Sequence, residues 1–366
     1  MKKIILISDS FKGTLSSKEV CDIEAQVLES EFPGCQVVKR PIADGGEGTV
    51  SCFLGALKGQ LVHVPVCDAF GTEMAGFYGR FDDFAVIEMA AVAGIVSNSR
   101  RDPMIASTYG VGQLIKHAID SGCRKILLGL GGSVTNDCGA GMAAALGTKF
   151  YNEAGQCFIP AGGNLDKVKR IERGPALGAE ISCMCDITNP LYGASGAAYV
   201  FAPQKGASPD QVKVLDENLV AFANIIKREL GVDVSQIPGG GAAGGMGAGS
   251  VAFLGASLKR GIDYILDIIG FDQLLDGADL VITGEGRLDS QSLGGKVVSG
   301  VTSRAGAAGV PVIAVCGASE ISNGEAIGIC RIYETSKGRR NMAEISANCR
   351  EDLRRTMIDL SKEIGN

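Results

Sequence analysis

Histidine is scarce in this sequence, and its cysteines show no metal-binding pattern. The 366 residues include two histidines, His63 and His117, and 12 cysteines without a CxxC pair. The closest two cysteines are Cys183 and Cys185. A zinc site needs several Cys and His ligands at close spacing, so the sequence argues against one. The cysteine pattern favours buried, reduced thiols in a cytosolic protein.

Long apolar runs and an excess of positive charge are also missing. No segment approaches the ~18 apolar residues of a membrane span. The opening MKKIILISDSF has too short an apolar stretch for a signal peptide. The chain has 35 Lys and Arg against 41 Asp and Glu, a net charge of −6, whereas nucleic acids and anionic membranes require a basic face. We therefore expect a cytoplasmic protein with neither of these partners.

Glycine, in contrast, is abundant. The 52 glycines are about twice the usual ~7% share, and they are not periodic. Aliphatic runs surround them, which indicates many tight loops between regular elements rather than collagen or disorder. The length exceeds the ~250–300 residues at which a single core stops growing, so two domains are expected.

Both ends of the chain have an α/β pattern. Near the start, KIILIS and QVVKRPI are strand-like, and Ser16 with Glu19 predicts a capped helix between them. Near the end, DLVITGEG, VPVIAVCGA and GICRIYE are strand-like, with helices around them. Five such strands suffice for a flavodoxin-like parallel sheet. We predict an α/β protein of two domains: a discontinuous flavodoxin-like domain of residues 1–65 plus 284–366, and an inserted α/β domain of residues 66–283.

Five loops combine glycine with acidic or amide side chains. They are residues 9–13, 44–48, 131–137, 186–190 and 284–290. Ligands of open α/β sheets bind outside the carboxyl ends of strands, and glycine turns with helix starts favour phosphate. The nearby carboxylates would repel phosphate unless Mg²⁺ lies between them. With Lys12, Lys205, Arg287 and Lys296 as cations, these loops contain the groups needed for phosphoryl transfer.

Each loop also has a simpler interpretation. A single glycine-rich loop is more often a turn, and Asp137 fits a helix N-cap. Ser133, Thr135 and Asn136 could bond only to their own loop. Lys205 and Lys296, taken alone, are ordinary surface lysines. The segment GGGAAG satisfies GxGxxG at Gly239, Gly241 and Gly244 but follows Pro238 rather than a clear strand, which makes it a weak dinucleotide signal.

As an ordered set, the loops resemble the bacterial glycerate kinase type-1 family (glycerate 2-kinase). The matching motifs are DSFKGTLS, PIADGGEGT, GLGGSVTNDCGAG, CDITNPLYG, PQKGAS, PGGGAAGGMGAG and TGEGRLDSQSLGGK. They span nearly the whole chain. The departures are small: the family usually has Ala at Val134, Gly at Cys138 and Ala at Gly240.

The resemblance implies ATP-dependent, Mg²⁺-dependent phosphorylation of D-glycerate in a two-domain α/β protein. Between the two phosphoglycerate products, 2-phosphoglycerate is favoured. Two alternatives stay open, an NAD(P)-dependent oxidoreductase of a small hydroxy acid and a non-catalytic metabolite sensor. A homodimer is also left open.

With the family in view, we expect an active site in the cleft between the two domains. The residues expected to act in catalysis are Asp186 as the favoured base, Lys12, Arg287 and Asp289. Those expected to bind ATP are Gly131, Gly132, Ser133, Thr135, Asn136, Asp137, Gly241, Gly244, Gly245, Lys205 and Lys296. Those expected to hold Mg²⁺ are Asp44, Glu47 and Glu285. Those expected to contact glycerate are Asp9, Ser10, Asn189 and Ser290.

Overall fold

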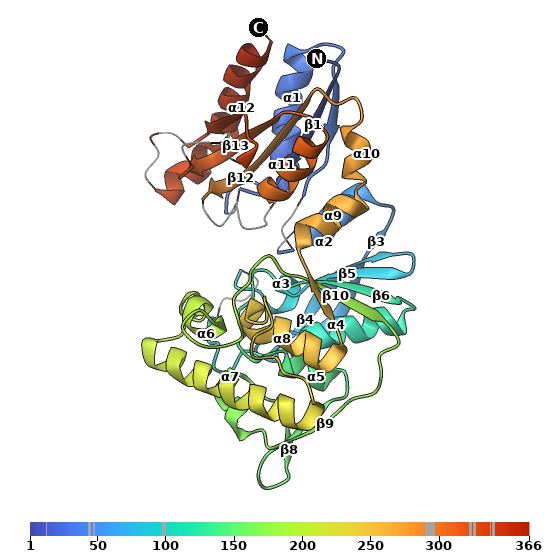
Figure 1. Ribbon diagram of the computed structural model, residues 1–366, viewed down its shortest axis with the longest axis vertical. Helices are drawn as coiled ribbons and strands as arrows, with labels where there is room; N and C mark the ends of the chain where they lie inside the picture. Colours follow the sequence, from blue (N-terminus) through green and yellow to red (C-terminus); the bar gives the residue numbers. More distant parts are fainter. Residues whose placement is uncertain are drawn as a thin grey trace. The chain divides into compact units, whose positions relative to one another are not determined.

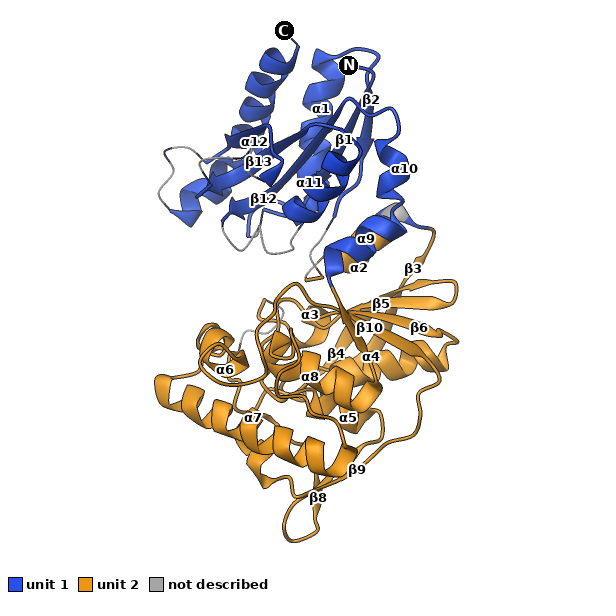
Figure 2. Ribbon diagram, in the orientation of Figure 1, with its two compact units in different colours: residues 1–44, 55–57, 260–366 blue, residues 45–54, 58–259 orange. Residues whose placement is uncertain are grey.

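The computed structural model divides the chain into two compact units, which Figure 2 colours separately. It describes all residues except 12, 43–44, 47, 97–99, 290–296, 322–323, 325–326, 337, 339–340 and 366, and the side chain of residue 56. Unit 1 comprises Met1–Asp44, Gly55–Leu57 and Arg260–Asn366; unit 2 comprises Gly45–Leu54 and Lys58–Lys259. These limits differ from the predicted domain boundaries chiefly at 45–54, 58–65 and 260–283.

Unit 1 is built on one parallel sheet that joins the two ends of the chain. Its strands are β1 (Lys3–Ser8), β2 (Gln36–Lys39), β12 (Leu280–Leu288), β13 (Val312–Ser319) and β14 (Arg331–Glu334). They lie in the order β14-β13-β12-β1-β2 and all pair in parallel. This is the 2-1-3-4-5 order of flavodoxin-like sheets. The register sets Ile4 beside Leu280 and Ser8 beside Gly284.

Helices cover both faces of this sheet (Figure 1). One face packs on α1 (Ser17–Glu31) and α12 (Met342–Ile364), because alternate strand residues such as Leu6 and Ile282 share a core with Leu28 and Leu353. The other face packs on α11 (Val297–Ala307), whose Val298 clusters with Leu288. Two short helices, α9 (Gly261–Ile268) and α10 (Phe271–Leu275), contact α11.

Unit 2 has a mixed sheet. Its strands are β3 (Gln60–Cys67), β4 (Glu73–Phe81), β5 (Phe84–Glu88), β6 (Lys125–Gly129), β10 (Glu180–Met184) and β11 (Ser257–Lys259), in the order β11-β10-β6-β5-β4-β3. The β3–β5 segment is an antiparallel meander, whereas β5, β6, β10 and β11 are parallel. A small sheet of β7 (Lys149–Tyr151), β8 (Cys157–Phe158) and β9 (Arg170–Glu172) completes the strands described.

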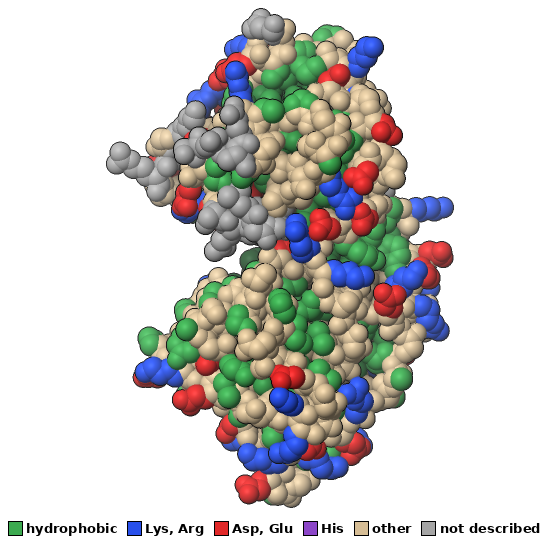
Figure 3. All heavy atoms as spheres, viewed as in Figure 1, with side chains coloured by type: hydrophobic (Ala, Val, Ile, Leu, Met, Phe, Trp, Pro, Cys, Tyr) green, Lys and Arg blue, Asp and Glu red, His purple; other side chains and the backbone are tan. Residues whose placement is uncertain are grey.

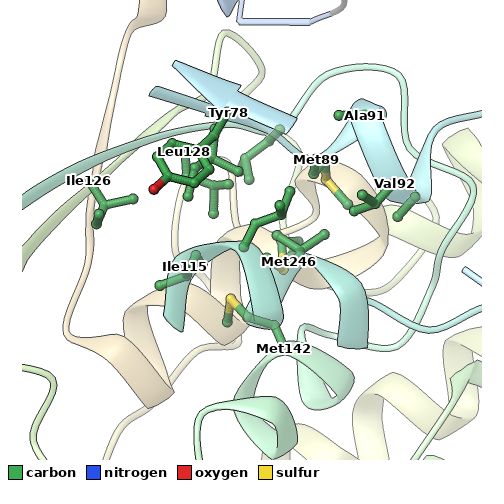
Figure 4. Packing of buried hydrophobic residues seen from close by; sticks show 14 of the residues in the cluster. Tyr78, Met89, Ala91, Val92, Ile115, Ile126, Leu128, Met142 and Met246 are labelled. Atoms are coloured by element: carbon green, nitrogen blue, oxygen red, sulfur yellow. The ribbon is translucent and has the colours of Figure 1, made fainter. Parts of the chain in front are cut away.

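The helices of unit 2 enclose an aliphatic and methionine-rich core. They are α2 (Thr49–Ala56), which ends in unit 1, α3 (Ala90–Ala93), α4 (Tyr109–Asp120), α5 (Ala140–Ala145), α6 (Ala197–Phe201), α7 (Pro209–Leu230) and α8 (Ala242–Leu254), with 3₁₀ turns at Gly162–Lys167 and Pro203–Lys205. Figure 4 shows Met142 and Met246 with Ile115 and Leu128 in this core. The core fixes the ends of β5 and β6, from which the loops described below emerge.

The surface carries mixed charge. On the face shown in Figure 3, Lys and Arg side chains are interspersed with Asp and Glu. Among the helices in the described part of the chain, none is both long enough and apolar enough to cross a membrane.

Candidate active site

The loop between β6 and α5 passes very close to the backbone of another loop. A Cβ atom at Gly131 would lie 2.7 Å from Gly46 Cα, closer than real Cβ atoms come. The Gly131 amide donates a hydrogen bond to the Gly45 carbonyl at 3.2 Å. Gly132 has φ +74°, which L-residues with a side chain adopt only with strain. Glycine at these two positions therefore lets the 131–137 loop pack against residues 45–46.

Asp137 joins the starts of two helices. Its Oδ2 accepts hydrogen bonds from Thr108 N and Thr108 Oγ1, both at 2.8 Å, and from Gly141 N at 3.2 Å. Its Oδ1 accepts from Gly139 N at 3.2 Å. Burial raises the pKa of this carboxyl, and the hydrogen bonds oppose that rise. The carboxylate thus performs the helix-start role considered in the sequence analysis, although Gly139 is the N-cap of α5.

Lys205 is a buried residue and not an ordinary surface lysine. Its side chain is 2% exposed, and its Nζ donates to Thr135 O at 2.6 Å and to Ser133 Oγ at 3.0 Å. Desolvation lowers the pKa of Lys205 to about 7, while the charge of Asp137 acts in the opposite direction. The interpretation as a surface lysine is therefore wrong, because the amine points into the 131–137 loop.

The glycine-rich start of α8 packs against the same loop. Gly244, with φ +70°, would place a Cβ only 2.0 Å from the carbonyl oxygen of Thr135. Its own carbonyl accepts a hydrogen bond from Cys138 N at 3.0 Å. Gly245 follows with φ +88°. These glycines permit contact between two backbones.

Asn136 lies in this enclosed region with unused hydrogen-bonding groups. Its side chain is fully buried, and neither Nδ2 nor Oδ1 has a hydrogen-bond partner among the residues that the structure describes. A buried amide without a partner costs about 1–3 kcal/mol per group. Such a group is a feature to be explained by a ligand or a water molecule.

The segment after β10 joins the same region. The Asn189 carbonyl accepts a hydrogen bond from Gly241 N at 3.0 Å, and Asn189 Nδ2 donates to Ser195 O at 2.7 Å. Asp186 is half-buried just before it, and burial together with the Asp186 charge raises the pKa of Cys185 to about 11. The sequence-predicted residues of the 131–137 loop, Lys205, Asn189 and Gly241–Gly245 therefore form one network within unit 2.

Unit 1 brings a second group of predicted residues together. Asp9 N donates to Gly284 O at 2.8 Å, at the level where β1 ends beside β12, which continues to Leu288. This places Asp9, directly after β1, next to Glu285 within β12, and the two residues are 5% and 9% exposed. Ser10 N donates to Asp9 Oδ1 at 2.6 Å. Two buried carboxylates at one sheet edge favour a cation between them.

Arg287 lies further along β12 and is exposed. Its guanidinium forms an ion pair with Glu320, and this contact raises the pKa of Arg287, with a small addition from Asp289. An exposed pair of this kind contributes little to stability, so Arg287 can exchange Glu320 for the carboxylate of a ligand.

Comparison with known proteins identifies the family. The profile described as "Glycerate kinase family" matches residues 4–364. The chain belongs to the glycerate kinase family. A glycerate kinase of Bacillus subtilis (strain 168) is 38% identical over 372 residues, covering 99% of this chain and 97% of the relative. A glycerate 2-kinase of Escherichia coli (strain K12) is 43% identical, covering 86% and 85%.

A solved structure supports the same assignment. A crystal structure from Salmonella typhimurium LT2, of a protein assigned as glycerate kinase 2, shares 39% identity with a TM-score of 0.86 and covers 100% of this chain and 98% of that one. The predicted α/β class with parallel sheets is confirmed. As a member of this family, the chain is an enzyme, a small-molecule kinase that phosphorylates a hydroxyl.

Five predicted site residues of this glycerate kinase family member lie outside the described residues. They are Lys12, Asp44, Glu47, Ser290 and Lys296. Within the part of the chain that is described, no group of three or more His, Cys, Asp or Glu is arranged to hold a metal. The carboxylates of Asp9 and Glu285 nevertheless provide the hard oxygen donors that Mg²⁺ accepts, since it commonly takes one or two carboxylates together with phosphates.

Two acidic residues near these loops were not predicted from the sequence. Glu88, 2% exposed at the end of β5, accepts hydrogen bonds from Gly48 N at 3.2 Å and from Val50 N, and so holds the start of α2. Its position directly after a strand-like run, FAVI, is the signal that could have found it. Glu24 is buried in α1 and accepts from Ser8 Oγ at 3.4 Å. Its signal was an acid on the apolar stripe of that helix.

Proposed function

We propose that this enzyme transfers the γ-phosphoryl group of ATP to D-glycerate with the assistance of Mg²⁺ and makes 2-phosphoglycerate. The observation that carries the proposal is the full-length relationship: the Bacillus subtilis glycerate kinase aligns with 99% of the chain, so all five glycine-and-acid loops fall within the family's own extent. The Escherichia coli relative, a glycerate 2-kinase, favours the 2-phosphate.

The network in unit 2 supports a role in binding ATP phosphates. Turns of glycine, serine and threonine at a helix start present backbone N–H groups to anions, and the buried Asn136 amide adds unpartnered donors and an acceptor. We assign the triphosphate to the residues expected to bind ATP, which are Gly131, Gly132, Ser133, Thr135, Asn136, Asp137, Gly241, Gly244, Gly245, Lys205 and Lys296.

The acidic edge of unit 1 supports a role for Mg²⁺. We assign the ion to Glu285, beside Asp9, directly or through water. Asp44 and Glu47, which lie outside the described residues, are the other two proposed ligands. Bound Mg²⁺ neutralises charge on the transferring phosphoryl group.

The remaining assignments concern the acceptor. Arg287, with Lys12, is suited to clamp the glycerate carboxylate because a guanidinium makes two parallel hydrogen bonds. Asp186 accepts the proton of the acceptor hydroxyl while the oxygen of that hydroxyl forms a bond to the γ-phosphorus of ATP. The bond between the γ-phosphorus and the β–γ bridging oxygen breaks, and ADP leaves. Asp289 is the second choice for this proton. Asp9, Ser10, Asn189 and Ser290 complete the glycerate contacts.

The experiment that tests the proposal is ADP release from ATP with four acceptor conditions: D-glycerate, L-glycerate, glycerol and none, each with Mg²⁺ and with a chelator in its place. The proposal predicts that ATP is converted to ADP only in the condition that contains both D-glycerate and Mg²⁺. Tight NADH binding without ATP use would instead support the oxidoreductase alternative. Nucleotide binding without turnover on any acceptor would support the sensor.

A further inference from the structure

Lys205 contacts the 131–137 loop from inside the protein. The residue ends a 3₁₀ turn, Pro203–Lys205, and its side chain is 2% exposed. Nζ donates to two groups of one loop, the Ser133 hydroxyl at 3.0 Å and the Thr135 carbonyl at 2.6 Å. Two of the three hydrogen-bond positions of an ammonium group are therefore occupied by the loop itself.

The Thr135 carbonyl is fixed from two sides. Lys205 Nζ approaches it at 2.6 Å, and the left-handed Gly244 lies so close that an added Cβ would be 2.0 Å from the same oxygen. Thr135 Oγ1 also lies 3.5 Å from the Ala243 carbonyl, to which it donates. Without Lys205, this buried carbonyl would lose its side-chain hydrogen-bond donor.

The Lys205 amine is surrounded by hydrogen-bond acceptors of the loop and is influenced by one carboxylate. Of the described charged groups, Asp137 is the one whose field acts on Lys205, and it is itself held by Thr108, Gly139 and Gly141. A buried lysine is rare unless it is paired or hydrogen-bonded. Asn136, which lies between Thr135 and Asp137 in the loop, is fully buried, and neither of its amide atoms has a partner among the described residues. The loop therefore has hydrogen-bonding capacity at Asn136, while Lys205 is already engaged.

We infer that Lys205 is a positioning residue: it holds the Ser133–Thr135 backbone from the inside so that this loop and the Asn136 amide meet the phosphates of a nucleotide, and it does not contact those phosphates itself. This inference rests on the proposed function, in which the loop binds ATP. It replaces the direct nucleotide contact assigned to Lys205 above with an indirect one.

The test compares Lys205→Met, Ser133→Ala and the double variant, with Lys213→Met, an exposed lysine of α7, as the control. Dissociation constants for ADP are measured by calorimetry without an acceptor, and amide hydrogen exchange is measured on the nucleotide-free protein. We expect Lys205→Met to weaken ADP binding about 10- to 100-fold and to speed exchange in residues 132–137 at least tenfold. In loop exchange, the double variant should equal Lys205→Met alone, because Ser133 and Lys205 hold the loop through the same contact.

A second readout separates positioning from phosphate contact. At saturating ATP, kcat of Lys205→Met should stay within about fivefold of the parent, since the loop is ordered once nucleotide is bound. A hundredfold fall in kcat with unchanged loop exchange would overturn the inference and make Lys205 a direct ligand. Strictly additive effects of the two substitutions on loop exchange would also overturn it. If Lys205→Met does not fold, Ser133→Ala decides: unchanged loop exchange in that variant contradicts the inference.

These measurements still test the role of Lys205 if D-glycerate is not the acceptor. Exchange and ADP binding involve no glycerate, so the absence of turnover on D-glycerate in the parent enzyme would count against the proposed function alone. If the parent enzyme binds no nucleotide at all, both the proposed function and the positioning role of Lys205 are contradicted.

Discussion

Glu24 is a buried acid whose protonation is tied to folding. It is fully buried in α1, with Ser8 Oγ at 3.4 Å as its hydrogen-bond donor. Burial raises the pKa of Glu24 to about 8, from an ordinary 4.5. The native state therefore binds a proton between those two values that the unfolded state releases, so the stabilisation from Glu24 is complete below pH 4.5 and is lost as the pH rises to about 8.

Glu24→Gln should remove this pH dependence. Gln cannot titrate, so the unfolding free energy of the variant relative to the parent should rise by about 4 kcal/mol from pH 5 to pH 8, three pH units at ~1.4 kcal/mol each. Urea unfolding of the parent and the variant at a series of pH values measures this difference in unfolding free energy. Glu29→Gln, on the exposed face of the same helix, is the control and should track the parent. Parallel pH curves for parent and Glu24→Gln would show that Glu24 is ionised in the fold.

Asp186 is the residue whose chemical role is most directly testable. Replacement by Asn keeps the size and removes the proton acceptor, so kcat should fall by about 10²–10⁴-fold while the melting temperature stays within a few degrees. Steady-state kinetics with ATP and D-glycerate measure this, with Asp289→Asn as the comparison. A near-normal rate in Asp186→Asn together with a large loss in Asp289→Asn would transfer the role of base to Asp289.

At the residue scale, the sequence indicated candidate loops but not which of their side chains are buried. Lys205 lies in PQKGAS, a polar segment with the composition of a surface turn, and only the tertiary contact with Ser133 and Thr135 shows its burial. Glu24 is a charged residue in a helix whose other buried positions are mostly apolar, so the helical pattern indicates its burial, but the Ser8 partner is a tertiary contact. Burial of a charge depends on partners distant in sequence, which spacing does not reveal.

At the scale of elements, the close contact between α8 and the 131–137 loop gives a stability prediction. Gly244→Ala should cost about 3 kcal/mol, because a Cβ at φ +70° is strained and would also meet the Thr135 carbonyl. Gly231→Ala is the matched control: its φ is +71°, but no atom lies within 4 Å, so only about 1 kcal/mol of backbone strain is expected. Chemical denaturation of the two variants measures the difference. Equal losses would contradict the contact.

The strands of unit 1 and their union in one flavodoxin-like sheet were predicted, but the register of each pair was not. The apolar runs at 3–8 and 312–319 fix the strands, but the pairing of β1 with β12 joins Ile4 to Leu280, across a separation that no local pattern encodes. Residues 260–283 were predicted to belong to the inserted part, whereas α9 and α10 lie in unit 1, where Ile262 of α9 fills the space that Gly300 leaves on α11. The sequence pattern of a short amphipathic helix shows which of its faces is apolar but not which core that face packs against.

At the scale of the whole molecule, two sheets divide the predicted chemistry. The parallel sheet of unit 1 carries Asp9, directly after β1, and Glu285, within β12, and the mixed sheet of unit 2 supports the loop held by Lys205. Carboxylates for a cation and backbone amides for phosphates are the complementary requirements of phosphoryl transfer. Phosphoryl transfer requires both groups, so the product has to be examined with the complete chain.

Phosphorus NMR of the product formed by the complete chain from ATP, Mg²⁺ and D-glycerate tests the proposed reaction most directly. A single new monoester resonance that matches authentic 2-phosphoglycerate, with one ADP formed per product, is the expected result. A resonance that matches 3-phosphoglycerate would contradict the assigned position of transfer. ATP left intact beside unreacted D-glycerate would contradict the proposed reaction itself.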